Sequence, residues 1–359
     1  RGNSGAVLYG DNAVGGVINI VTKTGASGGK PMAMTIETGV GSFNQKLANF
    51  SATTNYGPWS TAAFANTIQC DGYRANNRLN QQNMTGEVRY TTPDFSAFFN
   101  LAGDNQRLGL PGYRSTKYYL DGVNQLATDP RGTVTPYDYA NQQGINATTG
   151  FTKTLWTGAE LIVDGGLRSK KQQANFYDDP RAPYPRYVDS TLQTWSITPR
   201  LSMKNTFFGM TSNVLTGIDY YNAGYDSDRS QWIGVAPIHA YHLNQETLAG
   251  YWQHTVGLLP STDVSYGGRI QPTSLDARDV LNLAAPGAAP WGTAHVPLNT
   301  NETNHAWHVG IEHRFNDVFA VFGRAANAFR TPNVDERIGV GPDANGNANF
   351  NLRTQTSRD

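Results

Sequence analysis

The sequence has 359 residues, with 28 Lys and Arg against 28 Asp and Glu, and only 16% of its residues are charged. A net charge of zero without a basic run argues against nucleic acid as a partner. The single cysteine, Cys70, excludes an internal disulfide, and no run of about 18 apolar residues predicts a membrane-spanning helix.

The first 25 residues form a glycine-punctuated segment. Gly10, Gly15 and Gly16 are spaced for tight turns or close backbone contacts, and residues 17–21 are a short β-rich run. There is no initiating Met and no signal peptide before this segment, so we expect the sequence to be part of a longer chain.

Period-two alternation dominates from about residue 30 onward, which places successive side chains on opposite faces of a strand. In the clearest run, Trp307, Val309 and Ile311 alternate with His308 and Glu312. The other alternating runs are residues 32–40, 84–90, 95–101, 155–167, 195–201, 214–220 and 248–258. Because no amphipathic helix of useful length is found, the sequence predicts an all-β chain.

The connections between these runs are of two kinds. Short links are predicted at residues 55–58, 92–94, 259–261 and 316–317, whereas long polar, aromatic-rich stretches cover residues 107–147, 175–190, 223–246, 272–303 and 331–352. Short turns at one end and long loops at the other are typical of a transmembrane antiparallel β-barrel. Soluble domains rarely contain so many long loops.

Aromatic residues near the predicted strand ends favour the same architecture, because Trp and Tyr gather at both membrane–water interfaces. They are Tyr56, Trp59, Tyr73, Tyr90, Trp195, Tyr220, Tyr221, Trp252 and Trp307. Aromatic residues are also common in strands generally, so this feature alone does not decide the matter.

Two motifs that usually carry chemistry fail on their context. Residues 25–29 match the letters of a hydrolase nucleophile elbow around Ser27, but a strand rather than a helix follows. Asp343 begins a calcium-loop pattern that lacks the required glycine and the final glutamate. We expect residues 25–29 to be a flexible linker.

Histidine and acidic pairs give no convincing metal or catalytic site. His305 and His308 would lie on opposite faces of a strand. His239 and His242 fall in a predicted long loop, where a metal contact is possible but a solvated loop is the simpler interpretation. The pairs Asp178-Asp179, Asp226/Asp228 and Asp276/Asp279 are interpreted as solvated loop charges. The sequence therefore predicts no enzyme, no cofactor and no metal site.

The long stretches do combine aromatic rings with cations. Such groups suit a large anionic or aromatic ligand, through stacking, cation–π contacts and charge-assisted hydrogen bonds. The candidate ligand-binding residues are Tyr113, Arg114, Arg186, Tyr187, Arg229, Trp232 and Tyr241.

The first segment resembles the C-terminal end of the plug domain of TonB-dependent outer-membrane receptors. That family carries a Leu-Tyr-Gly followed by Ala-x-Gly-Gly-Val-Ile-Asn-Ile and Thr-Lys. The match here comprises Leu8, Tyr9, Gly10, Ala13, Gly15, Gly16, Val17, Ile18, Asn19, Ile20, Thr22 and Lys23, with Ser4 as the preceding small residue.

Further resemblances follow in the family's order along the chain. Leu110-Pro111-Gly112 is similar to a motif after an early barrel strand, and Gly267-Gly268-Arg269 to one in a middle strand. Residues 329–336 resemble Phe-Arg-Ala-Pro-Asn-x-x-Glu, with Thr331 in place of Ala. Residues 352–357 resemble Leu-x-Pro-Gln-x-Ser, with Thr354 in place of Pro.

The resemblance implies a plug end at residues 1–25 and a partial outer-membrane barrel at residues 26–359. We count roughly 12 to 14 spanning strands, against about 22 in complete transporters of this kind. It also implies energised uptake of a scarce ligand, most simply a ferric siderophore, across the outer membrane of a Gram-negative bacterium. The implied partners are TonB with its inner-membrane energising complex, outer-membrane lipid and lipopolysaccharide. An incomplete barrel leaves two open sheet edges, so these residues alone are not expected to transport.

Several alternatives stay open at this point. A passive porin-like channel would leave the plug-like segment unexplained, and so would an adhesin. An outer-membrane enzyme would need a catalytic group that the sequence does not offer. Within the same family, cobalamin, haem and glycan importers share the scaffold, and the ligand is decided by loop residues rather than by the fold.

Overall fold

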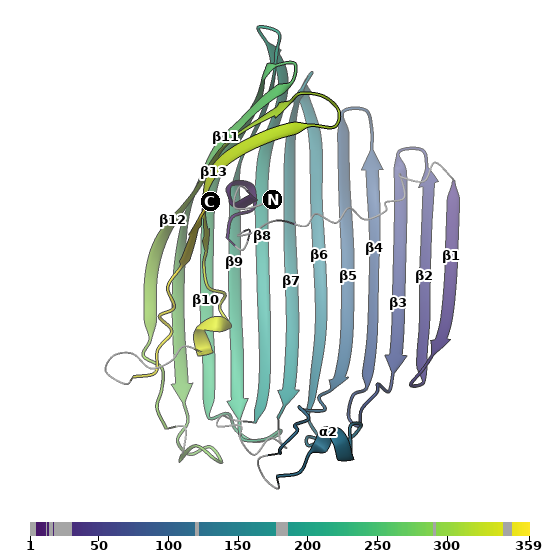
Figure 1. Cartoon of the computed structure of the whole chain (residues 1–359), viewed down its shortest axis with the longest axis vertical. Coiled ribbons are helices and arrows are strands. Elements are labelled where there is room, and N and C mark those ends of the chain that lie inside the picture. Colours follow the sequence, from purple (N-terminus) through teal and green to yellow (C-terminus); the bar gives the residue numbers. More distant parts are fainter. Residues whose placement is uncertain are drawn as a thin grey trace.

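The computed structural model describes residues 5–11, 13, 17, 31–118, 122–176, 186–289, 292–339 and 347–359. Its main feature is one sheet of 14 strands in chain order from β1 to β14 (Figure 1). Every neighbouring pair is antiparallel, and β1 and β14 form the two edges of the sheet. The predicted all-β, incomplete antiparallel barrel is confirmed, with a strand number at the top of the expected range.

The strands lengthen toward the middle of the chain. Their bounds are β1 (Met32–Gly41), β2 (Gln45–Tyr56), β3 (Trp59–Cys70), β4 (Leu79–Thr91), β5 (Phe95–Gly109), β6 (Tyr139–Trp156), β7 (Ala159–Asn175), β8 (Tyr187–Phe207), β9 (Met210–Ser230), β10 (His239–Leu259), β11 (Thr262–Leu281), β12 (Leu298–Arg314), β13 (Ala320–Arg330) and β14 (Gln355–Arg358).

The sheet has an apolar outer face and a polar inner face, as the alternation requires. On β12, Trp307, Val309 and Ile311 are exposed on the outside. His308 is buried on the inside whereas His305 is exposed, so the predicted opposite placement of these two histidines is confirmed. Because large apolar side chains are exposed along the whole outer face, that face suits lipid rather than water.

The connections separate into two ends of the sheet. The short-turn end joins β2–β3, β4–β5, β6–β7, β8–β9, β10–β11 and β12–β13. The opposite end, which we call the long-loop end, carries residues 110–138, 176–186, 282–297 and 331–354, together with shorter loops at 42–44, 71–78 and 231–238. All four predicted short links lie at the short-turn end, so the asymmetry of the loops is confirmed.

Two expectations about these connections are wrong. Residues 155–167 are not one strand, because β6 ends at Trp156 and Gly158 forms the turn with a φ of 84°. The polar stretch 223–246 is mostly strand, since β9 continues to Ser230 and β10 begins at His239. These strands extend past the apolar band, where both faces become polar and the alternation disappears.

The aromatic residues are less uniform than predicted. Tyr56, Trp59 and Tyr90 do lie at strand ends, and the rings of Trp59 and Tyr90 are 4.9 Å apart. Four others lie well inside strands: Trp195, Tyr220, Trp252 and Trp307. Tyr73 lies in the loop after β3, under the Arg131 guanidinium. Tyr221 belongs to the inner face of β9, because it follows the outward Tyr220.

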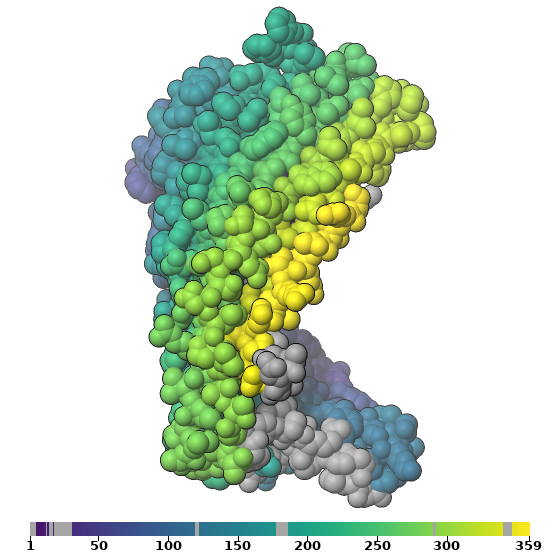
Figure 2. Space-filling view, turned by 90° about the vertical axis from the view of Figure 1, so that its left-hand side faces the viewer, coloured from purple at the N-terminus to yellow at the C-terminus, as the bar shows by residue number. Residues whose placement is uncertain are grey.

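Helices are short and few in the described part of the chain. They are α1 (Gly5–Tyr9), α2 (Gln125–Thr128) and the 3-10 helix η3 (Glu336–Gly339). None of them is long or apolar enough to cross a membrane. Helix α1 contacts β10, β11, β12 and β13, so it lies inside the curved wall (Figure 1). Figure 2 shows this wall from the side, with the C-terminal strands along its edge.

Candidate functional site: the inner wall and the long-loop end

Helix α1 is attached to the wall by a small apolar cluster. Ala6, Val7 and Ala13 are buried against Ala306 of β12 and two residues of β13, Ala328 and Phe329. Small side chains on both partners let the helix backbone approach the strands closely. The first part of the chain and the Phe329 motif, which are far apart in the sequence, are therefore packed together.

Gly10 continues this contact in a backbone conformation that strongly favours glycine. Its φ is 70°, in the left-handed region, and a Cβ here would lie 2.8 Å from Arg269 Nη2 and 2.9 Å from Gln271 Oε1. A side chain would therefore be strained in backbone and would collide with β11. The Leu-Tyr-Gly and Gly-Gly-Arg motifs are thus two sides of one contact.

Arg269 is the centre of a buried polar network. Its Nη1 donates to Asp219 Oδ2 of β9 at 2.7 Å, and its Nε donates to Gln271 Oε1 at 2.9 Å. Its guanidinium carbon also lies 5.5 Å from the ring centre of Tyr251 on β10. A buried charge pair of this kind is stable only while both partners are present.

Asp11 brings a second carboxylate to Arg269. Burial raises the pKa of the Asp11 carboxyl above its usual range, and the Arg269 charge and the Gln271 side chain offset part of that rise. The docked segment therefore favours the protonated, neutral form of Asp11 more than free solution does. This gives the contact between residues 5–11 and the wall a pH dependence.

The motif at residues 329–336 folds as a closed turn after β13. Arg330 Nη2 pairs with Glu336 Oε1, and Glu336 Oε2 accepts a hydrogen bond from the Asn333 backbone N–H at 3.0 Å. The Arg330 hydrogen bond lowers the pKa of the Glu336 carboxyl below its usual range. Next to it, Arg337 is buried and donates to the carbonyl oxygens of Phe350 and Leu352.

The structure describes only some of the remaining residues predicted for the plug motif. Leu8 and Tyr9 belong to α1, with Tyr9 exposed, and Val17 is exposed as well. Gly15, Gly16, Ile18, Asn19 and Ile20 lie outside the described residues. So do Ser27 and Asp343, the two failed motif positions, and Asp178-Asp179.

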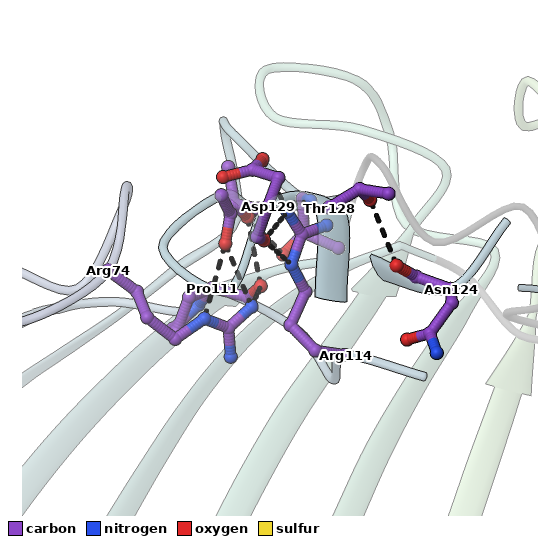
Figure 3. Close-up of polar contacts among 9 residues, drawn as sticks. Arg74, Pro111, Arg114, Asn124, Thr128 and Asp129 are labelled. Atoms are coloured by element: carbon purple, nitrogen blue, oxygen red, sulfur yellow. Dashed lines mark hydrogen bonds and ion pairs between the residues drawn. The ribbon is translucent and has the colours of Figure 1, made fainter. Parts of the chain in front are cut away.

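The predicted ligand-binding residues do not form one surface. Arg114 is a structural residue: its Nε donates to the Asp129 carbonyl oxygen at 3.0 Å, and its Nη2 pairs with the Asp129 carboxylate (Figure 3). Its side chain is buried within loop 110–138. Tyr113, beside it, is exposed and 6.4 Å from the Tyr118 ring.

Two side chains from loop 71–78 hold loop 110–138 in place. Arg74 donates to the carbonyl oxygens of Pro111 at 2.7 Å, Gly112 at 2.6 Å and Gly132 at 3.1 and 3.2 Å (Figure 3). Asn76 Nδ2 donates to three more carbonyls, those of Leu110, Thr135 and Asp138. The loop is therefore a fixed structure rather than a free polar strand connection.

The other candidates lie on β8, β9 and β10. Tyr187 begins β8 and is buried on its outer side, next to Arg186. Trp232 is 43% exposed in loop 231–238. Arg229 and Tyr241 face inward. Arg229 lies opposite the buried His239 of β10, and Tyr241 follows His239 by two residues on that strand, so all three side chains share one face. Only these two predicted residues are brought together on the inner wall.

Tyr241 belongs to a cluster of stacked rings that sequence reasoning missed. The His239 ring stacks on Tyr241 with an interplanar angle of 4°, and the His295 ring stacks on Phe350. Asp279 joins the two histidines: it accepts from His239 Nδ1 at 2.9 Å and from the His295 backbone N–H at 2.8 Å. Loops 282–297 and 331–354 are thereby attached to β10 and β11.

The expectations for His239, His242 and the acidic pairs therefore need correction. His239 and His242 are strand residues on opposite faces, with His239 buried and His242 exposed beside Asp226. Asp279 is buried rather than solvated. Among the described residues, no group of three or more His, Cys, Asp or Glu side chains is arranged to hold a metal ion.

Only some of the residues that were not predicted could have been found from a pattern in the sequence. Asp219 and Gln271 are polar residues at inward positions of alternating runs, which a reading of both faces could have picked out. His295, Arg74 and Asn76 lie in loops, and their partners are distant in the sequence. No local pattern identifies them.

Comparison with known proteins now places the chain. Residues 38–359 match the family model described as TonB dependent receptor-like, beta-barrel. No curated protein matches the sequence.

Solved structures of the same fold are distant in sequence. The closed form of the ferric-catecholate import receptor Fiu from Escherichia coli K12 has a TM-score of 0.77 and 14% identity, covering 100% of this chain and 58% of that one. BauA, the ferric preacinetobactin receptor from Acinetobacter baumannii, has 0.73 and 11%, covering 99% and 55%. FauA, the alcaligin outer-membrane receptor from Bordetella pertussis, has 0.65 and 13%, covering 91% and 47%.

The chain spans about half to three-fifths of the length of these receptors. At identities this low, the solved structures establish only the fold. Membership in the family is established by the family model, which matches most of the chain. With its 14 antiparallel strands, its outward apolar face and its loop asymmetry, this chain belongs to the TonB-dependent receptor-like β-barrel family.

Proposed function

We propose that this chain is part of an outer-membrane receptor that imports a ferric siderophore, or a similar scarce iron chelate, with energy delivered by TonB. In this proposal residues 1–25 are the end of the plug, and residues 26–359 are barrel wall with extracellular loops at the long-loop end. The outward apolar face would contact outer-membrane lipid and lipopolysaccharide. TonB and its inner-membrane energising complex would act on a more N-terminal part of the plug.

The observation that carries the proposal is the docking of residues 5–11 on the inner wall. Gly10 lies so close to β11 that an added Cβ would be 2.8 Å from Arg269 Nη2, and Ala6 and Val7 are fully buried against the wall. A passive porin needs no segment fixed inside its barrel. The names of similar structures, which include ferric-catecholate and preacinetobactin receptors, favour iron chelates as the ligand class.

The mechanism follows from two kinds of contact. The ligand would bind at the long-loop end, and displacement of the plug would then open a path past the inner wall. The buried network around Arg269 would hold the plug end in register while the rest of the plug moves. The ligand crosses chemically unchanged, since the proposal gives the protein no catalytic role.

The test is a binding titration of the full-length receptor in detergent against ferric siderophores, cobalamin, haem and oligosaccharides. We expect tight binding of a ferric chelate, and uptake of that chelate in cells that depends on TonB. Tight binding of another member of the panel would keep the transporter but change its ligand. Absence of all binding together with free ion conduction in a planar bilayer would favour the porin.

A further inference from the structure

Arg229 lies on the inner wall at the long-loop end. It is the penultimate residue of β9 and lies opposite His239 on β10 and Val188 on β8. Directly opposed residues of antiparallel strands share a face. Because His239 and Val188 are both buried and Tyr225 and Ser227 precede it on the buried inner face of β9, Arg229 projects into the interior.

The Arg229 guanidinium has no protein partner among the residues that the structure describes. Its Nε is buried without a hydrogen bond, and in the part of the chain that the structure describes no ion pair or side-chain hydrogen bond reaches it. A guanidinium offers five N–H donors, and burying any of them unpaired is costly. Arg74, Arg114 and Arg269, in contrast, all donate to protein oxygens.

The nearby carboxylate is already committed elsewhere. Asp279 accepts from the ring of His239, from the ring of His295 and from the His295 backbone N–H. Asp228, adjacent in the chain, lies on the opposite face of β9. Among the described residues, neither of these two carboxylates is paired with Arg229.

The residues around Arg229 are aromatic rings, which strengthen the attraction of its guanidinium for an anion without neutralising its charge. Tyr241 is 5% exposed, it stacks on His239, and the Arg229 charge acts on it. Phe350 and His295 close the same cluster. Apolar rings lower the local dielectric, so an anion placed against this guanidinium would be held more strongly than at an open surface.

We propose that Arg229 is the residue that recognises negative charge in the ligand, by donating two parallel N–H bonds to a pair of anionic oxygens. A carboxylate, a catecholate or a phosphate presents such a pair. This inference rests on the proposed function and deepens it: the imported chelate carries a net negative charge. Trp232, exposed three residues further along, is free to contact the remainder of such a ligand.

The experiment measures dissociation constants of the full-length receptor for an anionic ferric tris-catecholate and a neutral ferric tris-hydroxamate. For Arg229→Gln we expect the constant for the anionic chelate to rise about ten- to a hundredfold, as for loss of a charge-assisted pair. Binding of the neutral chelate should change by less than about twofold. Arg229→Lys keeps the charge but loses the fork, so its effect should be intermediate.

Arg278→Gln is the matched control, because Arg278 is exposed on the outer face of β11 and pairs with Asp276. It should leave both affinities unchanged. A retained heat-modifiable band on gels shows that each variant is folded.

Equal losses for both chelates in Arg229→Gln, or no loss for either, would overturn the inference. Inorganic phosphate is titrated separately: if it binds the wild type as tightly as the chelate and Arg229→Gln abolishes this, the site serves a free anion and the chelate assignment is wrong. If the wild type binds no chelate at all, the proposed function fails. The phosphate titration then decides alone whether Arg229 binds anions.

Discussion

The two halves of the wall share one outer face but differ on the inside. On β1 to β4 the inner face carries a row of side-chain hydrogen bonds: Asn49 donates to Glu37 at 2.9 Å, Asn66 to Asn49 at 2.5 Å and Asn83 to Asn66 at 3.3 Å. These residues line an open cavity of about 590 Å³. On β9 to β13 the inner face instead buries charges and packs against α1.

This difference shows which part of the wall depends for its stability on the segment packed inside it. Neutral amides can bond to one another or to water with little penalty, so the first half needs no cover. Arg269 and Asp219 lose water when α1 and the neighbouring strands surround them, so they need each other. Contacts of the covered half are therefore specific, and their loss should be expensive.

The largest effect is expected for Arg269→Met. It leaves the buried Asp219 carboxylate without a partner, which typically costs about 3–5 kcal/mol. The measurement is the denaturation midpoint of the full-length receptor in detergent. The matched change in the open half is Arg89→Met, since Arg89 pairs with Glu87 at 3.0 Å in a more accessible position, and it should cost about 1 kcal/mol or less.

The same comparison has a second arm. In Arg269→Met combined with Asp219→Leu, most of the loss should be recovered, because no charge remains buried alone. If Arg89→Met proves as damaging as Arg269→Met, the contrast between the two halves is wrong.

A smaller, local effect is expected for Gly10→Ala. The added methyl group must adopt a left-handed backbone and displace Arg269, at a cost of about 1–3 kcal/mol. Hydrogen exchange of residues 5–11 reports the release of this segment. Gly57→Ala is the control, because Gly57 has a φ of 54° but no atom within 4 Å of its Cβ position. Equal exchange in both variants would show that the Arg269 contact is unimportant.

Asn76→Ala sharpens the comparison in the other direction. It removes three hydrogen bonds to loop 110–138, so protease cleavage within that loop should become about tenfold faster, corresponding to roughly 1–2 kcal/mol of local stability. Global unfolding should change little, because the inner face of this half supports itself. A large drop in the global midpoint would contradict that independence.

The smallest effect concerns pH. Since burial raises the pKa of Asp11 in the docked state, docking of residues 5–11 binds protons and weakens as pH rises from the ordinary carboxyl value through the raised one. Asp11→Asn should remove this dependence and strengthen docking at neutral pH. The check is protease accessibility of residues 5–11 from pH 4 to 8. An unchanged pH profile in Asp11→Asn would exclude Asp11 as its source.

The strands of the wall and their outer faces could be predicted from the sequence, but only part of the contacts on the inner face could. Trp307, Val309 and Ile311 could be placed on one face because lipid exposure imposes a strict alternation on the strand. His239 was misplaced because the strand there has left the apolar band, and nothing in a polar stretch distinguishes a projecting strand from a loop. The motifs around Gly10 and Arg269 were both recognised, yet their contact depends on the curvature of the sheet.

The arginines illustrate the limit most clearly. Arg114 and Arg229 stand in similar aromatic, polar sequence, and both were predicted to bind ligand. In the structure Arg114 forms an ion pair with Asp129. Asp279, on the inner face with Arg229, is instead bound to His239 and His295. A residue's type is local, but its partner is decided by the fold.

The position of α1 against β10 to β13 also fixes an order of events. Residues 5–11 precede every strand of the wall in the chain, but the surface that receives them exists only after β10 to β13 have been made and paired. We expect residues 5–11 to dock after the strands have paired, so that burial of this segment reports a completed wall. Pulse-labelling hydrogen exchange during refolding should accordingly find protection in β2 to β9 before it appears at Ala6 and Val7.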